Sequence, residues 1–355
     1  MRSAECAGRI AFALVFGVMF AFAPTAHGGT IPESERWATI THPGNPAHPP
    51  PEPGGFPTGY GRPVGQVNYE YQISRTETTG SEWFEFVLAY APFINPAEAG
   101  SSSFYSNRVR AVQTAPGVWQ YTLRSNAANR SVEVGWRYAA RFCNWLHNGK
   151  ANTAEAFERG VYDSSTFGGN PQAGFTDQRE RSPGATYFLP TLDEWIKASF
   201  WDPARYNPIT GETGYWLYPN GTDMPLVPGA PDMGGQTTVG TFGPGGPTVG
   251  MYEVGEYVNV QSPWGLWDVS GGRSEWLETA IIDTITGAML SRGRGGSRDW
   301  EIDLTGTADH IDRPRSGPPD FTDQGIRLAR IVPSPGTAVA LGCVFLRTTH
   351  TRRRR

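Results

Sequence analysis

The residues best suited to chemistry lie in one short stretch rich in glycine and tryptophan, residues 264–276. Asp268 and Glu275 supply carboxylates there, and the glycines between them allow backbone conformations that other residues rarely adopt. Trp264 and Trp267 are costly to leave in water, so the stretch should pack against the core. We therefore expect a turn-rich segment that holds carboxylates and backbone carbonyl groups close together.

A second candidate site is a group of arginines interspersed with glycines, namely Arg292, Arg294 and Arg298. Guanidinium groups form paired hydrogen bonds with anions, so these residues could bind a sulfated or carboxylated glycan. The alternative is that they form salt bridges with neighbouring acids such as Asp299. The expected ligand-binding residues are Trp264, Trp267, Arg292, Arg294, Arg298 and Trp300.

Other common catalytic motifs are absent from the sequence. There is no Gly-x-Ser-x-Gly nucleophile motif, phosphate-binding loop or dinucleotide fingerprint. The adjacent acids Asp193 and Glu194 follow Thr191 in a pattern typical of a helix start, which explains them without catalysis. The net charge of -4 and the pI of about 5.9 argue against a surface that binds nucleic acid.

The amino end of the chain has the composition of a secretory signal. Arg2 and Arg9 accompany an apolar run over residues 10–23, and small residues follow up to Gly29. This run of roughly 14 residues is shorter than the roughly 20 that a membrane span needs. We therefore expect a cleaved signal peptide over residues 1–29 and export of the protein.

The carboxyl end, residues 332–355, combines a Pro-x-Pro motif around Ser334, an apolar run and a terminal arginine cluster. It resembles the PEP-CTERM sorting signals of bacterial exported proteins, although Ser334 replaces the acidic residue of that motif. The resemblance implies transient membrane association, cleavage by a sorting protease, and a location on the cell surface or in the extracellular matrix. A disordered basic tail is the alternative.

The cysteines restrict what the exported chain can bind. Cys6 lies in the expected signal peptide and Cys343 in the tail, so removal of both ends leaves Cys143 alone. One cysteine forms neither an intramolecular disulfide nor a two-cysteine metal site. Because Cys143 lies on an amphipathic segment, we expect it to be a small buried hydrophobe.

Short strands and amphipathic helices should position these residues. Alternation over residues 67–73 predicts a half-buried strand with Val67, Tyr69, Tyr71 and Ile73 on one face. Further strands are expected at residues 37–40, 118–123, 288–294 and 325–331. The first expected helix covers residues 81–90 and is capped by Thr79 or Gly80. The second covers residues 134–147 and is ended by Asn148 and Gly149. The third covers residues 191–201 and is opened by a capping box of Thr191 and Glu194.

The composition also limits the architecture. The 44 glycines and 30 prolines exceed a fifth of the 355 residues, so much of the fold should be irregular. Residues 30–66 read as a lead strand and a Pro/Gly-rich loop. Residues 67–331 show no internal repeat or change of composition, which predicts one domain.

Several motifs, taken in order, resemble those of the formylglycine-generating enzyme family, also called the sulfatase-modifying-factor domain family. They are YQISRTETT at 71–79, GWRYA at 135–139 with FCNWL at 142–146, LPTLDEW at 189–195, GLWDVSGG and EW within 265–276, RGGS at 294–297 and GIRLA at 325–329. The resemblance covers roughly residues 37–331. It implies an α+β fold, a variant of the C-type-lectin fold with a few helices on short antiparallel strands and many irregular loops.

The resemblance also implies copper chemistry, from which this sequence departs. The oxidase activity of the family depends on two cysteines that follow the RGGS motif and bind copper, because a soft ion takes soft ligands. Those positions fall at Trp300 and about Thr305 here. Copper binding and conversion of a cysteine to formylglycine are therefore not expected.

Calcium is the second ion that the resemblance implies. The family takes its ligands from the stretch around the signature, and calcium needs six to eight oxygen atoms. Asp268 and Glu275 are the expected calcium ligands, but Gly272 stands where the family has an asparagine. The alternative is that Glu275 accepts backbone N–H bonds in a tight turn.

Two functions follow from these observations, and they leave open whether the chain is an enzyme. The first is an exported, noncatalytic protein with a structural role or with a glycan or protein ligand, which the missing cysteines favour. The second is a metal-dependent, nonheme oxidoreductase of unknown substrate. Relatives with an iron site use a histidine cluster in a separate helical domain that is absent here. The histidines outside both ends show no paired spacing, and they are His42, His48, His147 and His310.

Overall fold

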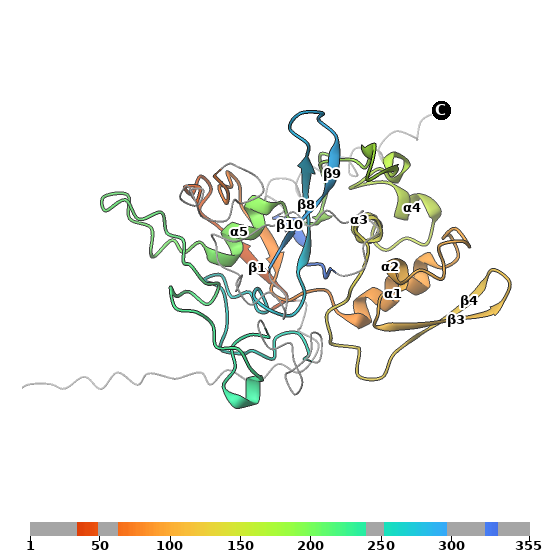
Figure 1. The fold of residues 1–355 in the computed structure, drawn as a ribbon, viewed down its shortest axis with the longest axis horizontal. Helices are drawn as coiled ribbons and strands as arrows, with labels where there is room; N and C mark the ends of the chain where they lie inside the picture. Colours follow the sequence, from red (N-terminus) through yellow and green to blue (C-terminus); the bar gives the residue numbers. More distant parts are fainter. Residues whose placement is uncertain (1–33, 49–62, 239–251, 297–323, 333–355) are drawn as a thin grey trace, which may run out of the picture.

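Short elements joined by long loops make up the protein. The computed structural model describes residues 34–48, 63–238, 252–296 and 324–332 (Figure 1). The helices are α1 (Gly80–Tyr90), α2 (Ser102–Tyr105), α3 (Trp136–His147), α4 (Ala154–Glu158) and α5 (Leu192–Phe200), with 3₁₀ turns η1 (Ser164–Thr166) and η2 (Pro231–Met233). The strands are β1 (Trp37–Ile40), β2 (Tyr71–Ser74), β3 (Val109–Ala115), β4 (Val118–Leu123), β5 (Gly169–Asn170), β6 (Gly174–Phe175), β7 (Tyr187–Phe188), β8 (Glu275–Ile282), β9 (Met289–Gly295) and β10 (Ala329–Ile331).

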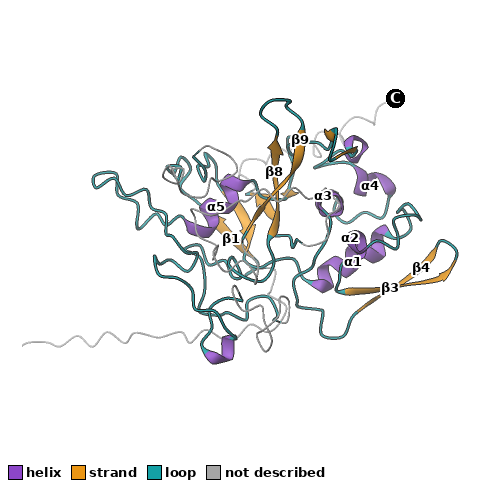
Figure 2. Ribbon diagram, viewed as in Figure 1, coloured by secondary structure: helices purple, strands orange, loops and turns teal. Residues whose placement is uncertain are grey.

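Two small antiparallel sheets form the frame of the fold (Figure 2). The first has the strand order β1-β2-β10-β7, and the second has the order β5-β6-β9-β8. Strand β2 pairs with β1, where Trp37 lies opposite Ser74. It also pairs with β10, where Ala329 lies opposite Ile73. The first and last described strands therefore meet in one sheet, while β3 and β4 form a separate hairpin beside α1 (Figure 1).

An aromatic core joins α1 and α3 to the sheets. Trp83 and Phe86 of α1 meet Phe142 of α3 with ring centroids 5.3 and 5.5 Å apart. Aromatic pairs of this kind contribute about 0.5–1.5 kcal/mol beyond the burial of their area. Trp195 of α5 is fully buried against β9, where Gly295 leaves room for its ring. The main core cluster draws on both sheets and on α1, α3 and α5.

The predicted helix signals are confirmed. Thr79 caps α1, and the Glu82 carboxylate accepts the Thr79 N–H at 2.8 Å to complete a capping box. Thr191 and Glu194 form the same arrangement at α5, where Glu194 accepts the Thr191 N–H at 2.6 Å. Helix α3 begins two residues after its predicted start and ends at His147 as predicted. The sequence signals were therefore sufficient for these three helices, whereas the short helices α2 and α4 were not predicted.

The predicted strand over residues 67–73 is wrong in its first half. Strand β2 covers Tyr71–Ser74, whereas Val67 is buried in a loop and Tyr69 is 40% exposed. Asn45 fixes this loop, because its side chain accepts the Val67 N–H at 3.1 Å and donates to the Gly65 carbonyl at 2.8 Å. The alternation in the sequence there corresponds neither to strand pairing nor to alternating burial, because residues 68–70 are all exposed.

The closing strands also differ from the prediction. Strand β9 lies one residue beyond the predicted start, β10 is confined to Ala329–Ile331, and β8 (Glu275–Ile282) was not predicted at all. Most residues of β8 are buried on both faces of the sheet. Such a strand lacks the alternation that marks a half-exposed strand, which is why the sequence pattern missed it.

The remaining expectations concern the fold class, the cysteine and the chain ends. The α+β class, with few helices on short antiparallel strands and many loops, is confirmed. Cys143 is fully buried on α3 as predicted, and burial raises the pKa of its thiol. No helix in the described ranges combines the length and apolar character needed to cross a membrane. The expected signal peptide, most of the Pro/Gly-rich loop and residues 333–355 lie outside the described residues.

Candidate functional site

The tryptophans of the 264–276 stretch serve packing. The Trp264 ring stacks on Trp201 with centroids 6.2 Å apart, and its indole N–H donates to the Trp201 carbonyl at 2.8 Å. The Trp267 backbone N–H donates to the Arg75 carbonyl at 2.8 Å. Both rings are half-buried, as the sequence predicted for residues that pack on the core. Neither one lines the large groove described below.

Glu275 forms a buried ion pair with Arg327. Its Oε1 accepts from Arg327 Nη2 at 2.7 Å and its Oε2 accepts from Trp195 Nε1 at 2.6 Å. Arg327 also donates to the carbonyls of Ser74 and Trp267, so it joins β2, β8 and the signature stretch. Because side chains already bond both oxygens, Glu275 does not fit the calcium ligand that the resemblance implied. The backbone N–H bonds of the alternative are likewise replaced here by side-chain donors.

Asp268 is engaged by a different partner. Its Oδ2 accepts the Gly255 N–H at 2.6 Å, and its backbone has a positive φ of 58°. Burial raises the pKa of Asp268 to about 6. Within the described ranges, no group of three or more His, Cys, Asp or Glu side chains is arranged to hold a metal ion. Asp268 and Glu275 therefore belong to no such group in the described part of the chain.

The arginines of β9 are structural, which corrects the ligand-binding role expected of them. Arg292 is 1% exposed, lies 3.6 Å from the centroid of the Trp136 ring and donates to the Glu278 carbonyl at 2.6 Å. Arg294 is also buried and donates to the Ser274 hydroxyl at 3.1 Å. A surface ligand cannot reach these guanidinium groups. Three further predicted positions lie outside the described residues, namely Arg298, Trp300 and Thr305.

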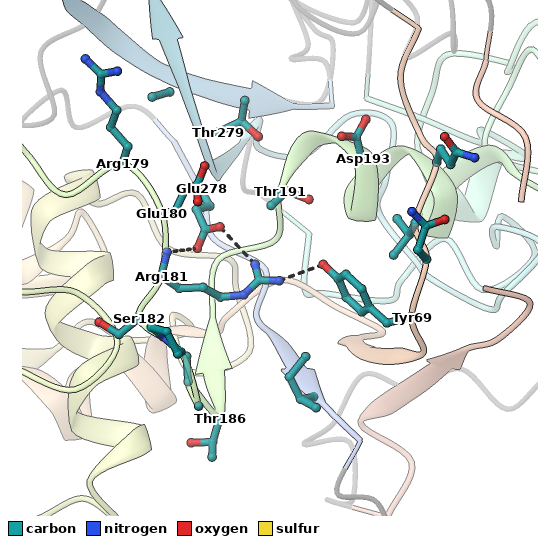
Figure 3. A pocket seen from close by; sticks show the side chains of 18 of the residues that line it. Tyr69, Arg179, Glu180, Arg181, Ser182, Thr186, Thr191, Asp193, Glu278 and Thr279 are labelled. Atoms are coloured by element: carbon teal, nitrogen blue, oxygen red, sulfur yellow. Dashed lines mark hydrogen bonds and ion pairs between the residues drawn. The ribbon is translucent and has the colours of Figure 1, made fainter. Parts of the chain in front are cut away.

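A wide groove lies over β8 and the start of α5 (Figure 3). It encloses about 1180 Å³. Its lining side chains come from segments that are far apart in the sequence, within 66–69, 179–186, 191–193, 278–282 and 331–332. The fold therefore assembles this groove from parts that no single motif contains.

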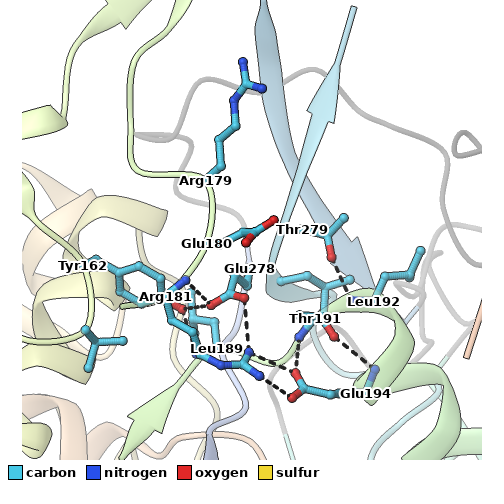
Figure 4. Close-up of polar contacts among 12 residues, drawn as sticks. Tyr162, Arg179, Glu180, Arg181, Leu189, Thr191, Leu192, Glu194, Glu278 and Thr279 are labelled. Atoms are coloured by element: carbon cyan, nitrogen blue, oxygen red, sulfur yellow. Dashed lines mark hydrogen bonds and ion pairs between the residues drawn. The ribbon is translucent and has the colours of Figure 1, made fainter. Parts of the chain in front are cut away.

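The floor of the groove is an arginine held between two buried glutamates (Figure 4). Arg181 Nη2 lies 2.7 Å from Glu194 Oε1, and its Nη1 lies 3.1 Å from Glu278 Oε1. The Tyr69 hydroxyl accepts from Arg181 Nη2 at 2.9 Å and donates to Glu194 Oε1 at 2.7 Å. The Arg181 guanidinium also lies 3.7 Å from the centroid of the Phe188 ring. Each polar group of this network is fixed by its neighbours.

Local structure explains why these side chains meet. Glu194 is the capping-box residue of α5, so the Thr191 N–H holds its Oε2 while its Oε1 faces Arg181. Glu278 lies in the middle of β8, where its Oε2 accepts from the Tyr162 hydroxyl at 2.8 Å and from the Arg181 N–H at 3.1 Å. A helix start, a strand and a loop thus each supply one member of the network.

Burial sets the electrostatics of the groove. The burial of Glu278 and the nearby charge of Glu194 raise the pKa of Glu278 to about 7, although Arg181 lowers it. Burial and Glu194 also raise the pKa of Tyr69, so its hydroxyl stays protonated. The floor therefore exchanges one proton near neutral pH. Its accessible groups are the side chains of Tyr69 and Arg181, because the carboxylates of Glu194 and Glu278 are buried beneath them.

Sequence reasoning missed this groove for an identifiable reason. The helix cap predicted from the sequence accounts for Asp193 and Glu194 only in part. Glu194 also binds Arg181. Asp193 lines the groove and accepts the Gly65 N–H at 2.7 Å. Glu278 carried a usable signal, because it stands in an otherwise largely apolar run of β8. An acid in a buried strand is almost never left without a partner.

Comparisons with known proteins give one family match. A family model described as the sulfatase-modifying factor enzyme 1-like domain matches residues 52–332. A search of curated proteins gives no significant match.

Solved structures that align with this chain include three with low sequence identity. CarF is 18% identical with a TM-score of 0.47, over 83% of this chain and 98% of CarF. Variable protein 1 of Treponema denticola is 19% identical with a TM-score of 0.48, over 83% of this chain and 95% of that protein. PvdO from Pseudomonas aeruginosa is 13% identical with a TM-score of 0.42, over 84% of this chain and 92% of PvdO.

Proposed function

The chain belongs to the sulfatase-modifying factor enzyme 1-like domain family, and from this premise we propose that it is an exported, surface-associated protein that binds a glycan without modifying it. The proposed binding site is the groove above Arg181. The observation that carries the proposal is its rigid polar floor, in which Arg181 is fixed by Glu194, Glu278 and Tyr69. Proteins with the same fold perform many different functions, so the proposed function rests on the residues of the groove and not on the fold.

The lining of the groove suits a ligand rich in hydroxyl groups. Thr191, Thr279 and Asp193 present oxygen atoms along its walls (Figure 3). Asn68 adds an amide group to the lining. Sugar hydroxyls both donate and accept hydrogen bonds, and the exposed ring of Tyr69 offers an amphipathic surface for a sugar ring. The volume of about 1180 Å³ exceeds the roughly 300–1,000 Å³ typical of pockets for drug-sized ligands. That size favours an oligosaccharide over a single sugar.

The cysteine content supports binding without oxidase chemistry. Trp300 and Thr305 stand where the copper cysteines of the family would fall. Cys143 remains after removal of the expected signal peptide and tail, but it is fully buried on α3 and its thiol has a raised pKa. A buried thiol of this kind is inert, since the thiolate is the form that binds metals.

The proposed location rests on the two ends of the sequence. The signal peptide would direct export, and the PEP-CTERM-like tail would hold the chain at the membrane until a sorting protease cuts it. Cell fractionation checks this, because the full chain should reach the surface or matrix while a chain ending at Ile331 should be released. Equal surface attachment of both chains would contradict a role for the tail.

Glycan binding is tested with a single change in the groove. Tyr69→Ala removes both the exposed ring and the fixed hydroxyl. Each contact contributes about 1 kcal/mol, so the affinity for an oligosaccharide should fall at least about tenfold. The ligand is chosen on an oligosaccharide array, and its affinity is measured by titration calorimetry.

Tyr206→Ala is the matched control, because Tyr206 is 41% exposed and lies outside the groove lining. This variant should bind as the wild type does. The proposal is wrong if no oligosaccharide binds, or if Tyr69→Ala binds as tightly as the wild type. Stoichiometric copper or iron in the purified protein would favour the oxidoreductase hypothesis instead.

A further inference from the structure

A second pocket, which we call the α3 pocket, lies between α3, the start of α2 and the 3₁₀ turn η1. It encloses about 340 Å³, near the lower end of the roughly 300–1,000 Å³ typical of ligand pockets. Its polar lining includes Glu98, Ser101, Ser103, Arg137, Arg141 and Ser164. It shares no lining residue with the groove above Arg181, so it is a separate site for a smaller and more polar ligand.

Arg141 is held in this pocket with one end of its guanidinium group unused. Its Nε donates to Glu158 Oε1 at 3.1 Å and to Glu158 Oε2 at 3.3 Å. Its Cζ lies 5.1 Å from the centroid of the Phe167 ring and 5.6 Å from that of the Tyr138 ring. No described residue accepts a hydrogen bond from its Nη1 or Nη2. Two such nitrogens suit a carboxylate, which accepts two parallel bonds from a guanidinium group.

Glu98 supplies a negative charge at the same pocket. The Tyr138 hydroxyl donates to Glu98 Oε2 at 2.5 Å, and the Tyr138 side chain is itself buried. Glu98 is exposed, and within the described part of the chain its Oε1 accepts no hydrogen bond and its carboxylate forms no ion pair. Tyr138 therefore connects the two charged groups, because its ring packs beside Arg141 and its hydroxyl holds Glu98.

The hydroxyl group of Ser101 adds a donor to the pocket. Ser101 Oγ accepts the Ser103 N–H at 3.3 Å and donates to no described residue, so its proton is available to a ligand. The Ser164 hydroxyl has a different task, because it donates to Glu158, the acid that positions Arg141.

The balance of charge selects the kind of ligand. Arg137 pairs with Asp177 at 2.7 Å and Arg141 pairs with Glu158, so each arginine has an acidic partner. Glu98 then adds a negative charge that repels a simple anion, while the two arginines repel a simple cation. A zwitterion avoids both repulsions, since it can place a negative group at Arg141 and a positive group at Glu98.

We propose that the α3 pocket binds a small zwitterion with the chemistry of a free α-amino acid. Its carboxylate lies at Arg141 Nη1 and Nη2 and at the Ser101 hydroxyl, and its ammonium group lies at Glu98 Oε1. The pocket volume suits a ligand of this size. Neither Arg141 nor Glu98 belongs to a motif that the sequence singled out, and the site is independent of glycan binding in the groove.

The test uses the full chain and the common L-amino acids as probes. Each amino acid is screened by the rise in melting temperature that a ligand of the folded state causes, and the strongest is measured by titration calorimetry. At least one should bind, with one site per chain. Its N-acetyl derivative lacks the ammonium charge and its carboxamide lacks the carboxylate, so each should bind at least about tenfold more weakly through the loss of a charge-assisted hydrogen bond.

Two variants test the assigned residues. Glu98→Gln and Arg141→Gln should each weaken amino-acid binding at least about tenfold. Glu98→Gln changes an exposed side chain and should fold, so it decides the outcome if Arg141→Gln is destabilised by leaving Glu158 without its ion-pair partner.

Glu155→Gln and Arg159→Gln are the matched controls. These two residues form an exposed ion pair at 3.6 Å and lie outside the pocket lining, so both variants should bind the amino acid as the wild type does. The proposal is overturned if no amino acid binds, if the N-acetyl derivative or the carboxamide binds as tightly as the amino acid, or if Glu98→Gln binds with unchanged affinity.

Discussion

At the scale of single residues, Arg181 determines the electrostatics of the groove. It bridges Glu194 and Glu278, whose side chains are 0% and 4% exposed. Loss of one partner from a buried ion pair typically costs about 3–5 kcal/mol, because the other charge stays buried without compensation. Arg181 is thus required for the floor of the groove to form, and its contacts organise that floor in the free protein.

Replacing Glu278 with glutamine should change how stability depends on pH. An unfolded glutamate has a pKa of about 4.3, whereas burial raises that of folded Glu278 to about 7. The folded state therefore holds the proton more tightly, and this stabilisation is complete below about pH 4 and is lost as the pH rises towards 7. Between about pH 4.5 and 8 the loss amounts to about 3 kcal/mol, at 1.36 kcal/mol per pH unit.

Denaturant unfolding of the wild type and of Glu278→Gln, at about pH 4.5 and about pH 8, measures this pH dependence of stability. The variant lacks the titrating group, so its free energy of unfolding relative to the wild type should improve by about 3 kcal/mol at the higher pH. A difference that stays constant across the pH range would show that Glu278 is ionised throughout.

Single residues were predictable from the sequence only where their partners are close along the chain. The capping box of Thr191 and Glu194 spans four residues and was recognised from its spacing. The bond from Glu194 to Arg181 joins α5 to a loop, and no spacing rule anticipates it. Arg292 shows the opposite error, because an arginine among glycines looks exposed until the fold buries it over Trp136.

At the scale of elements, α5 is held against β9 by a close contact between Trp195 and Gly295. A Cβ added to Gly295 would lie 2.5 Å from the fully buried ring of Trp195. Gly295→Ala should therefore destabilise the protein by about 1–3 kcal/mol, the usual cost of overpacking a core. Thermal or denaturant unfolding measures this loss.

Gly168→Ala is the control for this contact. Near Gly168 an added Cβ would meet chiefly the Thr176 hydroxyl, at 3.0 Å, which belongs to an exposed side chain and donates to the Thr166 carbonyl at 2.7 Å. This variant should lose less stability than Gly295→Ala, because an exposed side chain yields more easily than a fully buried ring. If Gly295→Ala and Gly168→Ala lower the free energy of unfolding equally, the close contact between α5 and β9 does not contribute specifically to stability.

The elements themselves were predictable to different degrees. Helices α1, α3 and α5 carry local caps and apolar stripes, and each was located within two residues at its start. Strand β8 was missed because burial on both faces leaves no alternation to detect. Tyr69 was misplaced on a strand because residue types alternate there in the sequence, whereas residues 68–70 are all exposed in a loop that Asn45 holds.

At the scale of the whole molecule, the fold could be expected from the sequence and the groove could not. Six motifs in the right order were enough to indicate the α+β fold with antiparallel sheets. The groove combines segments as distant as residues 66–69 and 278–282. Such contacts depend on the whole topology, so local patterns favoured the conspicuous 264–276 stretch, whose tryptophans pack on the core instead.

The measurement that most directly tests the central claim is hydrogen–deuterium exchange of the full chain with a panel of oligosaccharides. The account predicts that at least one oligosaccharide slows amide exchange in residues 66–69, 179–186 and 278–282, which line the groove. Residues 264–267, which pack on Trp201 and Arg75, should exchange at the same rate with and without it. Protection confined to residues 264–276, or no protection by any oligosaccharide, would contradict the account.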